Sequence, residues 1–114
     1  MPVIEEYVSA DGASPFGAWF DSLDPVPAAL VVKAKAKLQN GLGDVKPVGE
    51  GVSELRIHVG PGYRIYFGQD GERLVILLVG GDKGTQARDI ADAKAFWSDY
   101  KRRKRAASAA RKRK

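Results

Sequence analysis

A chain of 114 residues with 44% apolar residues can bury one hydrophobic core and is too short for two domains, so we expect one principal functional site. The sequence contains no cysteine and one histidine, which excludes disulfides and thiolate chemistry and argues against a structural zinc site. No run approaches the roughly 18 to 20 apolar residues that cross a bilayer, so we expect a cytoplasmic protein without a membrane partner. From the residue types we expect chemistry that needs no metal ion or cofactor.

The net charge of +5 is unevenly divided along the chain. Residues 101–114 (KRRKRAASAARKRK) contain nine of the 19 Lys and Arg residues and no acid, whereas residues 1–100 contain the other ten and all 14 acids. The sequence therefore divides into a slightly acidic domain (1–100) and a basic tail (101–114). The tail is expected to be a disordered arm, a continuation of the last helix, or an electrostatic anchor to RNA or DNA.

The N-terminal part of the sequence predicts one strand followed by two helices. Residues 3–8 (VIEEYV) are β-prone and form a short first strand. Each of the two helices begins with an N-cap residue and a proline at the first helical position: Ser14–Pro15 and Asp24–Pro25. The second helix buries an apolar stripe and ends close to Gly41.

The apolar period changes to two from Val52 onward, which predicts a β-hairpin. Apolar and polar side chains alternate in VSELRIHV and, after the turn GPG, in YRIYF. The turn makes the two strands antiparallel, so the apolar residues meet on the core side. The residues of the opposite parity are expected to share one surface: Arg56, His58, Arg64 and Tyr66.

The next segment, RLVILLVG (73–80), is apolar on both faces and is expected to be a central or covered strand. The chain then breaks at GGDKG (80–84) and enters a helix near Thr85, whose apolar residues recur at helical spacing and pack on the sheet. The order strand, helix, helix, three antiparallel strands, helix predicts an α+β sandwich with a twisted, mainly antiparallel sheet of about four strands.

Three cations of the domain are expected to converge, because Arg56 and Arg64 lie on neighbouring strands and Lys83 lies at a helix N-terminus. Together they could clamp a phosphodiester, and guanidinium groups can also stabilise charge that develops in a transition state. The alternative is an exposed sheet face on which Glu54 simply pairs with Arg56 or Arg64.

His58 is a candidate general base for a 2′-hydroxyl proton, because histidine is the side-chain type used most often for this role, although a lone histidine on a strand is more often an ordinary surface residue. Tyr66 offers an aromatic plane on which a base can stack. Further RNA contacts are expected from Lys46 and from the first cations of the tail: Arg102, Arg103, Lys104 and Arg105.

Residues 54–67 (ELRIHVGPGYRIYF) and the segment LLVGGDKGTQARDIADA resemble the HigB-like, phage-related addiction-module killer proteins of the RelE/ParE toxin superfamily. The resemblance covers residues 3–100. It implies a small α+β toxin, with two N-terminal helices and a C-terminal helix packed on the sheet, and a cognate antitoxin protein of the helix-turn-helix type. Relatives of the RelE type act on the ribosome and cut mRNA by in-line attack of the 2′-hydroxyl on the adjacent phosphate, without a metal ion.

Carried over position by position, the resemblance implies roles for four residues. Arg56 and His58 match strand positions at which relatives place basic residues that act on the 2′-hydroxyl or the phosphate. Arg64 matches the arginine that stabilises the phosphate transition state. Lys83 matches a basic residue that neutralises the phosphate or the leaving oxygen.

The C-terminal helix departs from the RelE pattern, since Gln86 and Asp89 lie where relatives often carry a tyrosine or histidine that acts as acid or base. Three functions therefore stay open. The first is a type II toxin that is a ribosome-dependent mRNA endoribonuclease and inhibits translation. The second is a ParE-like, non-enzymatic inhibitor of DNA gyrase, and the third is a nucleic-acid-binding or regulatory module in which the basic tail dominates.

Overall fold

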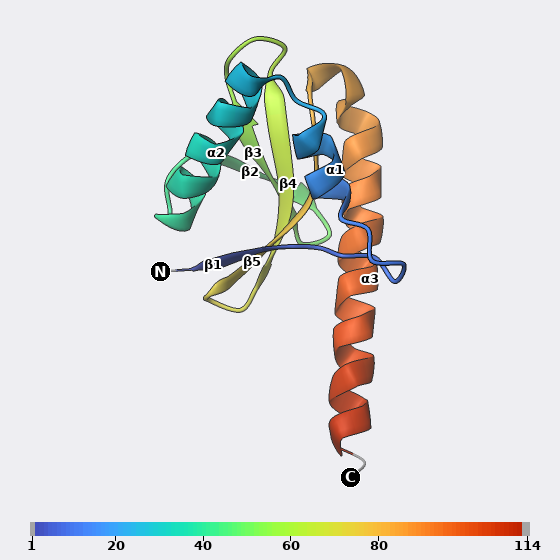
Figure 1. The fold of residues 1–114 in the computed structure, drawn as a ribbon. Coiled ribbons are helices and arrows are strands. Elements are labelled where there is room, and N and C mark those ends of the chain that lie inside the picture. Colours follow the sequence, from blue (N-terminus) through green and yellow to red (C-terminus); the bar gives the residue numbers. More distant parts are fainter. Residues whose placement is uncertain (1, 113–114) are drawn as a thin grey trace.

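The computed structural model describes residues 2–112 and consists of a five-stranded sheet with helices on both faces (Figure 1). Its elements follow in chain order: β1 (Val3–Glu6), α1 (Pro15–Asp21), α2 (Pro25–Gln39), β2 (Asp44–Gly49), β3 (Val52–Ile57), β4 (Tyr63–Asp70), β5 (Leu74–Gly81), a single 3₁₀ turn (Lys83–Thr85) and α3 (Gln86–Lys112). The predicted α+β class, with two N-terminal helices and one C-terminal helix, is confirmed.

The strands lie in the order β1-β5-β4-β3-β2, so the first two strands of the chain form the two edges of the sheet. β1 runs parallel to β5, with Val3 opposite Leu74, and the other neighbouring strands are antiparallel. β2 is a fifth strand that the sequence does not predict, because Pro47 and Gly49 are unusual within strands. The edge position accommodates the proline, since one side of an edge strand needs no hydrogen-bond partner.

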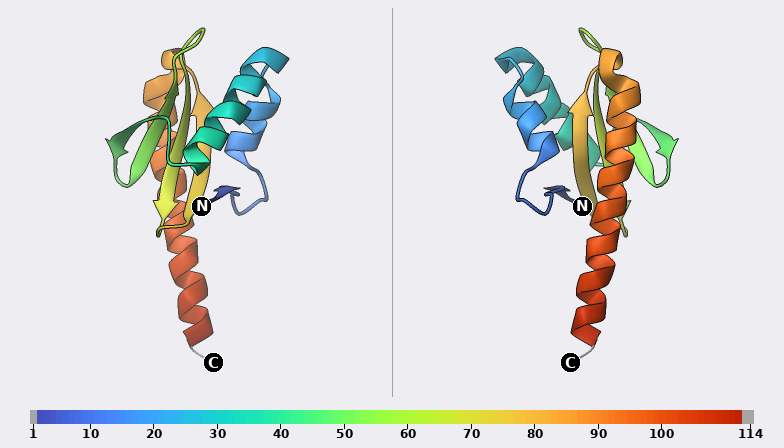
Figure 2. Two further views of the ribbon diagram at one scale, coloured as in Figure 1. Left: turned by 90° about the vertical axis from the view of Figure 1, so that its left-hand side faces the viewer. Right: turned by 90° about the vertical axis from the view of Figure 1, so that its right-hand side faces the viewer.

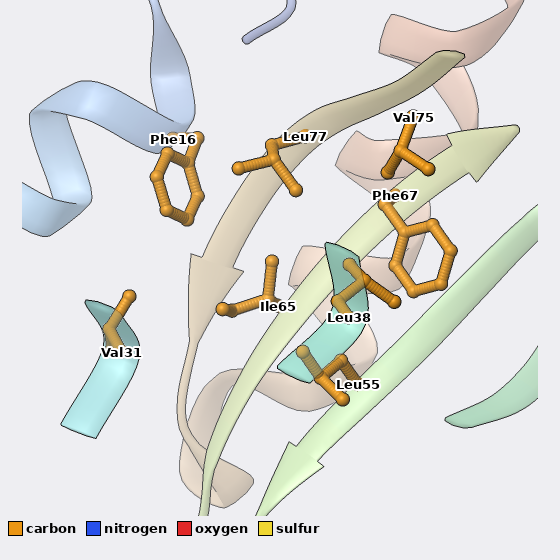
Figure 3. Close-up of a cluster of buried hydrophobic side chains, with 8 residues drawn as sticks. All are labelled: Phe16, Val31, Leu38, Leu55, Ile65, Phe67, Val75 and Leu77. Carbon is orange, nitrogen blue, oxygen red and sulfur yellow. The ribbon is translucent and has the colours of Figure 1, made fainter. Parts of the chain in front are cut away.

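The sheet separates two hydrophobic layers, because α1 and α2 cover one face and α3 covers the other (Figure 2). The first cluster lies under α1 and α2 (Figure 3) and consists of Phe16, Val31, Leu38, Leu55, Ile65, Phe67, Val75 and Leu77. The second cluster lies under α3 and consists of Tyr7, Val52, Tyr66, Ile76, Leu78, Ala93 and Trp97. β5 contributes to both clusters, which confirms the prediction of a covered strand.

The two N-terminal helices begin where the sequence predicts. Ser14 caps α1 through its side chain, and Asp24 occupies the N-cap position of α2. α2 ends before Gly41, which has a φ of 74° and whose backbone N–H donates to the carbonyl oxygen of Leu38 at 3.0 Å. Glycine adopts this left-handed conformation without steric cost, so the predicted C-terminal stop is confirmed.

Gly68 in β4 allows the indole ring of Trp97 from α3 to lie directly on the sheet. A Cβ atom at position 68 would lie 2.4 Å from Cε3 of Trp97, closer than van der Waals contact permits. We therefore expect Gly68→Ala to lower the free energy of unfolding by about 1–3 kcal/mol, and Gly68→Val to lower it further, as measured by urea denaturation. A Gly68→Ala variant as stable as the parent would show that α3 does not pack this closely on β4.

α3 projects well beyond the sheet (Figure 1) and is continuous across residue 100, where the sequence places the boundary between domain and tail. Residues 101–112 therefore extend the last helix, and the final two residues of the predicted tail lie outside the described part. Two tyrosine hydroxyls donate hydrogen bonds that hold α3 to the body: Tyr7 to Asp99 at 2.6 Å and Tyr100 to Asp70 at 2.7 Å. Within residues 2–112, none of the helices has the length and apolar character needed to cross a membrane.

The hydrogen bond between Tyr100 and Asp70 makes the attachment of α3 sensitive to alkaline pH. Burial, reinforced by the Asp70 carboxylate, raises the pKa of Tyr100 from 10.0 to about 12. The folded chain holds this proton more tightly than the unfolded chain, so the contribution to stability is complete below pH 10.0 and is lost as the pH rises through about 12. We expect Tyr100→Phe to lose less stability than the parent over this interval, measured by urea denaturation at each pH. Equal losses in the two proteins would contradict this assignment.

Candidate functional site

The β3–β4 loop and the 3₁₀ turn before α3 border a hollow of about 500 Å³. The backbone N–H of Lys83 donates to the carbonyl oxygen of Pro61 at 3.3 Å, which holds the turn against the loop. The residues that line the hollow are Arg56, Ile57, His58, Val59, Gly60, Pro61, Gly62, Arg64 and Lys83. The hollow thus brings together the four residues that the sequence proposes as catalytic.

Asp44 on β2 links two of these four residues. The pairing of β2 with β3 places Asp44 opposite Arg56, and its carboxylate accepts a hydrogen bond from Nη2 of Arg56 at 3.1 Å. The same carboxylate also contacts Nε2 of His58. The contact with His58 and then the one with Arg56 hold the pKa of Asp44 below its usual value of 3.8. His58 itself stands on the loop rather than on the strand, because β3 ends at Ile57 and the loop is longer than the predicted GPG turn.

Arg64 on β4 is held along two edges of its guanidinium group. Nη1 donates to the carbonyl oxygen of Gly62 at 2.6 Å, and Nε lies 3.5 Å from Oε2 of Glu54. Gln86, the first residue of α3, donates to the same Glu54 oxygen at 2.9 Å. The side chains of Arg64 and Glu54 are 13% and 2% exposed, so this ion pair is largely shielded from water. Within the described residues Nη2 of Arg64 has no hydrogen-bond partner, which leaves it available to a ligand.

The charges around the hollow do not cancel. Glu54 pairs with Arg64, as the alternative interpretation of the sequence expects, and Asp44 pairs with Arg56. Lys83 is exposed and forms no ion pair with any residue from 2 to 112. Three permanent cations therefore face two carboxylates, and the positive excess favours an anionic ligand such as a phosphate.

Tyr66 does not join the hollow. Its ring is fully buried in the second hydrophobic cluster, under α3, and this burial together with the nearby Glu54 carboxylate raises the pKa of its hydroxyl. The alternation of β4 correctly predicts the direction of this side chain, since Tyr66 lies on the face of the sheet opposite the first hydrophobic cluster. The prediction that Tyr66 stacks on a base is wrong, because α3 covers this face and leaves no ring surface exposed.

The start of α3 supplies a hydrogen-bond partner but no exposed acid. Gln86 contacts Glu54, whereas Asp89 is buried against β5 and contacts the hydroxyl of Thr85. A Cβ atom at Gly81 would lie 1.8 Å from Oδ2 of Asp89, which shows how closely this carboxyl approaches the strand. Asp89 therefore lies outside the hollow, and His58 is the imidazole in its lining.

The remaining predicted RNA contacts lie elsewhere. Lys46 is exposed on the edge strand β2, opposite Glu54 in the register, and does not line the hollow. The tail cations lie on the far part of α3, roughly 25 Å along the helix axis from Gln86 to Arg103. Three of the four predicted tail contacts are paired with acids: Arg102 and Arg103 with Asp99 of α3 itself, and Lys104 with Asp70 of β4. Arg105 is exposed and forms no ion pair within residues 2–112.

A larger hollow of about 640 Å³ lies at the end of α2 and is mostly apolar, with Glu72 as its single charged lining residue. It offers no cation to an anionic ligand. Among residues 2–112 there is also no group of three or more His, Asp or Glu side chains placed to hold a metal ion. The hollow at the β3–β4 loop is therefore the candidate functional site.

Sequence reasoning missed Asp44, the residue that joins Arg56 and His58. It treated Glu54 only as a competing ion-pair partner. The signal for Asp44 is its position as the first residue of β2, opposite Arg56 in the register, which is visible only once β2 is recognised as a strand. The signal for Glu54 is its place in the alternation of β3, because it points to the same side of the sheet as Arg56, the side that α3 covers.

Comparison with known proteins places the chain in a family. The family described as "Phage derived protein Gp49-like (DUF891)" matches residues 18–109. An uncharacterized protein of Haemophilus influenzae is 47% identical over 81 residues, which cover 69% of this chain and 82% of that protein. The family is associated with the toxins of phage-derived addiction modules, in agreement with the toxin resemblance of the sequence. The chain therefore belongs to the Gp49-like family of phage-derived proteins.

Proposed function

We propose that the protein is the toxin of a type II toxin–antitoxin system and that it acts as a ribosome-dependent mRNA endoribonuclease. The observation that carries this proposal is the convergence of Arg56, His58, Arg64 and Lys83 on one hollow. These residues come from two strands, a loop and a helical turn, and each has a use in phosphodiester cleavage. The HigB-like assignment within the RelE/ParE superfamily is part of this proposal.

In this mechanism His58 acts as the general base. Asp44 contacts Nε2 of His58, which favours the tautomer with the proton on Nε2 and leaves Nδ1 free to accept a proton. His58 removes the proton of the 2′-hydroxyl, the 2′-oxygen bonds to the adjacent phosphorus, and the bond from phosphorus to the 5′-oxygen breaks. The 5′-oxygen takes a proton from water, so the products are a 2′,3′-cyclic phosphate and a 5′-hydroxyl.

The three permanent cations stabilise the phosphate in this mechanism. Nη2 of Arg64 donates to a non-bridging oxygen, from a guanidinium whose other edges are already fixed by Gly62 and Glu54. Lys83 has no competing partner within the described residues and neutralises the phosphate or the departing oxygen. Such preorganised donors do not have to reorient during the reaction, which is the main source of electrostatic catalysis.

The proposed partners are the ribosome, its mRNA and a cognate antitoxin protein, all in the cytoplasm. A partner that covers the hollow or places a carboxylate against Arg56 and Lys83 would block access of the phosphate. The antitoxin is therefore expected to contribute acidic side chains to this surface, in competition with mRNA.

The test is to induce the gene without an antitoxin and to map the 5′ ends of cellular mRNA. Codon-phased breaks are expected with the parent protein and are expected to vanish with Arg64→Ala. Lys33→Ala is the matched control, because it removes one exposed cation from α2, which lies on the face of the sheet opposite α3. Intact mRNA with induced DNA damage would instead identify gyrase as the target, and unaffected growth would exclude both toxin activities.

A further inference from the structure

Five of the seven cations of residues 101–112 fall into two sets that differ in their partners. Arg103 and Lys104 face the body. Arg103 contacts Asp99 and the carbonyl oxygen of Val8, and its guanidinium lies 5.5 Å from the ring centre of Tyr7. Lys104 contacts Asp70. These two cations therefore fasten α3 to the rest of the protein.

The second set does not fasten α3 to the body by ion pairs, although Lys101 and Arg105 line a small hollow with Gln69 and Asp70. Lys101, Arg105 and Lys112 are exposed and form no ion pair with any residue from 2 to 112. Their spacing is i, i+4 and i+11, which places all three within about 40° of one another around the helix. The three residues form one continuous stripe, which we call the outward stripe.

We propose that the outward stripe of α3 binds the phosphate backbone of RNA. Residues 101–112 contain no acid, so nothing on this part of the helix competes for the three cations. The other residues from 106 to 110 are alanine and serine, which provide no large apolar or aromatic anchor for a protein partner. Binding to a phosphate backbone needs only positive charge, and the stripe supplies it.

The choice of RNA over DNA rests on the proposed function, because the hollow and the outward stripe belong to one unbroken helix. α3 begins with Gln86, which contacts Glu54 beside the hollow, and ends at Lys112. Arg105 lies roughly 30 Å along the helix axis from Gln86. An RNA that touches both regions must be long or folded, and the stripe therefore adds affinity for large RNA without taking part in cleavage.

The test measures how binding depends on salt. The purified full-length protein is titrated with a fluorescent 20-nucleotide oligouridylate at several salt concentrations. Arg105→Gln/Lys112→Gln is expected to reduce the slope of log affinity against log salt by about 1.4, since each phosphate contact in a single strand contributes about 0.7. The loss of these two phosphate contacts corresponds to roughly 25-fold weaker binding of the variant than of the parent at 0.1 M salt.

The matched control is Arg103→Gln/Lys104→Gln, which removes the same two charges from the adjacent positions. This control is expected to keep the parent slope and to lower the melting temperature, because the two side chains hold α3 to Val8, Tyr7 and Asp70 of the body. Equal reductions of the slope in both variants, or no reduction in the first, would overturn the assignment of the stripe. Tighter binding of a 20-nucleotide oligothymidylate than of the oligouridylate would overturn the choice of RNA.

This result is independent of cleavage. If induction of the parent protein leaves mRNA intact while the slope still falls as expected, the stripe stands as an RNA contact and the proposed function fails. If mRNA is cut but the slope does not change, the stripe fails and the proposed function stands.

Discussion

Replacing His58 with glutamine is expected to lower the rate of mRNA cleavage about 100-fold to 10,000-fold, the usual contribution of a general base. The reason is that glutamine preserves a hydrogen bond to Asp44 but cannot accept the 2′-hydroxyl proton at neutral pH. The side chain of His58 is 68% exposed, so the substitution should leave the melting temperature close to that of the parent. The measurement is single-turnover cleavage of ribosome-bound mRNA with purified protein.

Asp44→Asn provides the comparison for His58. Asparagine keeps the shape of the side chain but loses the charge that orients His58 and Arg56, so a smaller decrease in rate than that of His58→Gln is expected. A His58→Gln protein that cleaves within threefold of the parent would remove His58 from the mechanism. Such a result would leave positioning by Arg64 and Lys83 as the source of catalysis.

Replacing Glu54 with alanine is expected to lower the free energy of unfolding by about 3–5 kcal/mol, the cost of leaving a buried charge without its partner. Arg64 is 13% exposed, and Glu54 is the carboxylate that faces its Nε. Gln86 also loses its acceptor in this variant. The measurement is urea denaturation, and cleavage is expected to fall as well because the Arg64 guanidinium is no longer fixed.

A double-mutant cycle separates the ion pair from the general cost of changing a buried position. Arg64→Met leaves Glu54 without its cation, and Glu54→Ala leaves Arg64 without its carboxylate. The double variant Glu54→Ala/Arg64→Met is expected to be more stable than the sum of the two single losses predicts, since neither charge is then left alone. Additive losses would show that the two side chains do not interact.

Much of the fold follows from alternation and from turn residues. The parity of β3 and β4 correctly assigns Leu55, Ile65 and Phe67 to the first hydrophobic cluster, because a period of two fixes the face of each side chain. Parity does not state what covers the other face, which is why Tyr66 was misplaced. Its environment depends on α3, whose packing on β4 arises from contacts distant in the sequence.

Part of the site could be predicted from the sequence, because strand alternation and a tight turn fix which side chains of β3 and β4 are neighbours. Arg56, His58 and Arg64 lie near one another because of local strand pairing, and Lys83 joins them through the turn that follows β5. Asp44 comes from β2, whose proline and glycine conceal its strand character. The contacts of Arg103 with Val8 and of Lys104 with Asp70 could not be predicted either, since these partners lie outside α3 and are brought close only by its docking.

The parallel pairing of β1 with β5 has a consequence for the order of folding during translation. Val3 has no partner strand until Leu74 has left the ribosome, so the sheet cannot close before most of the chain has been made. Lys83 lies two residues after the end of β5 and completes the hollow. The nascent chain therefore gains its finished sheet and its full set of hollow-lining cations at nearly the same moment, late in synthesis. A chain that is cut short before this point has neither.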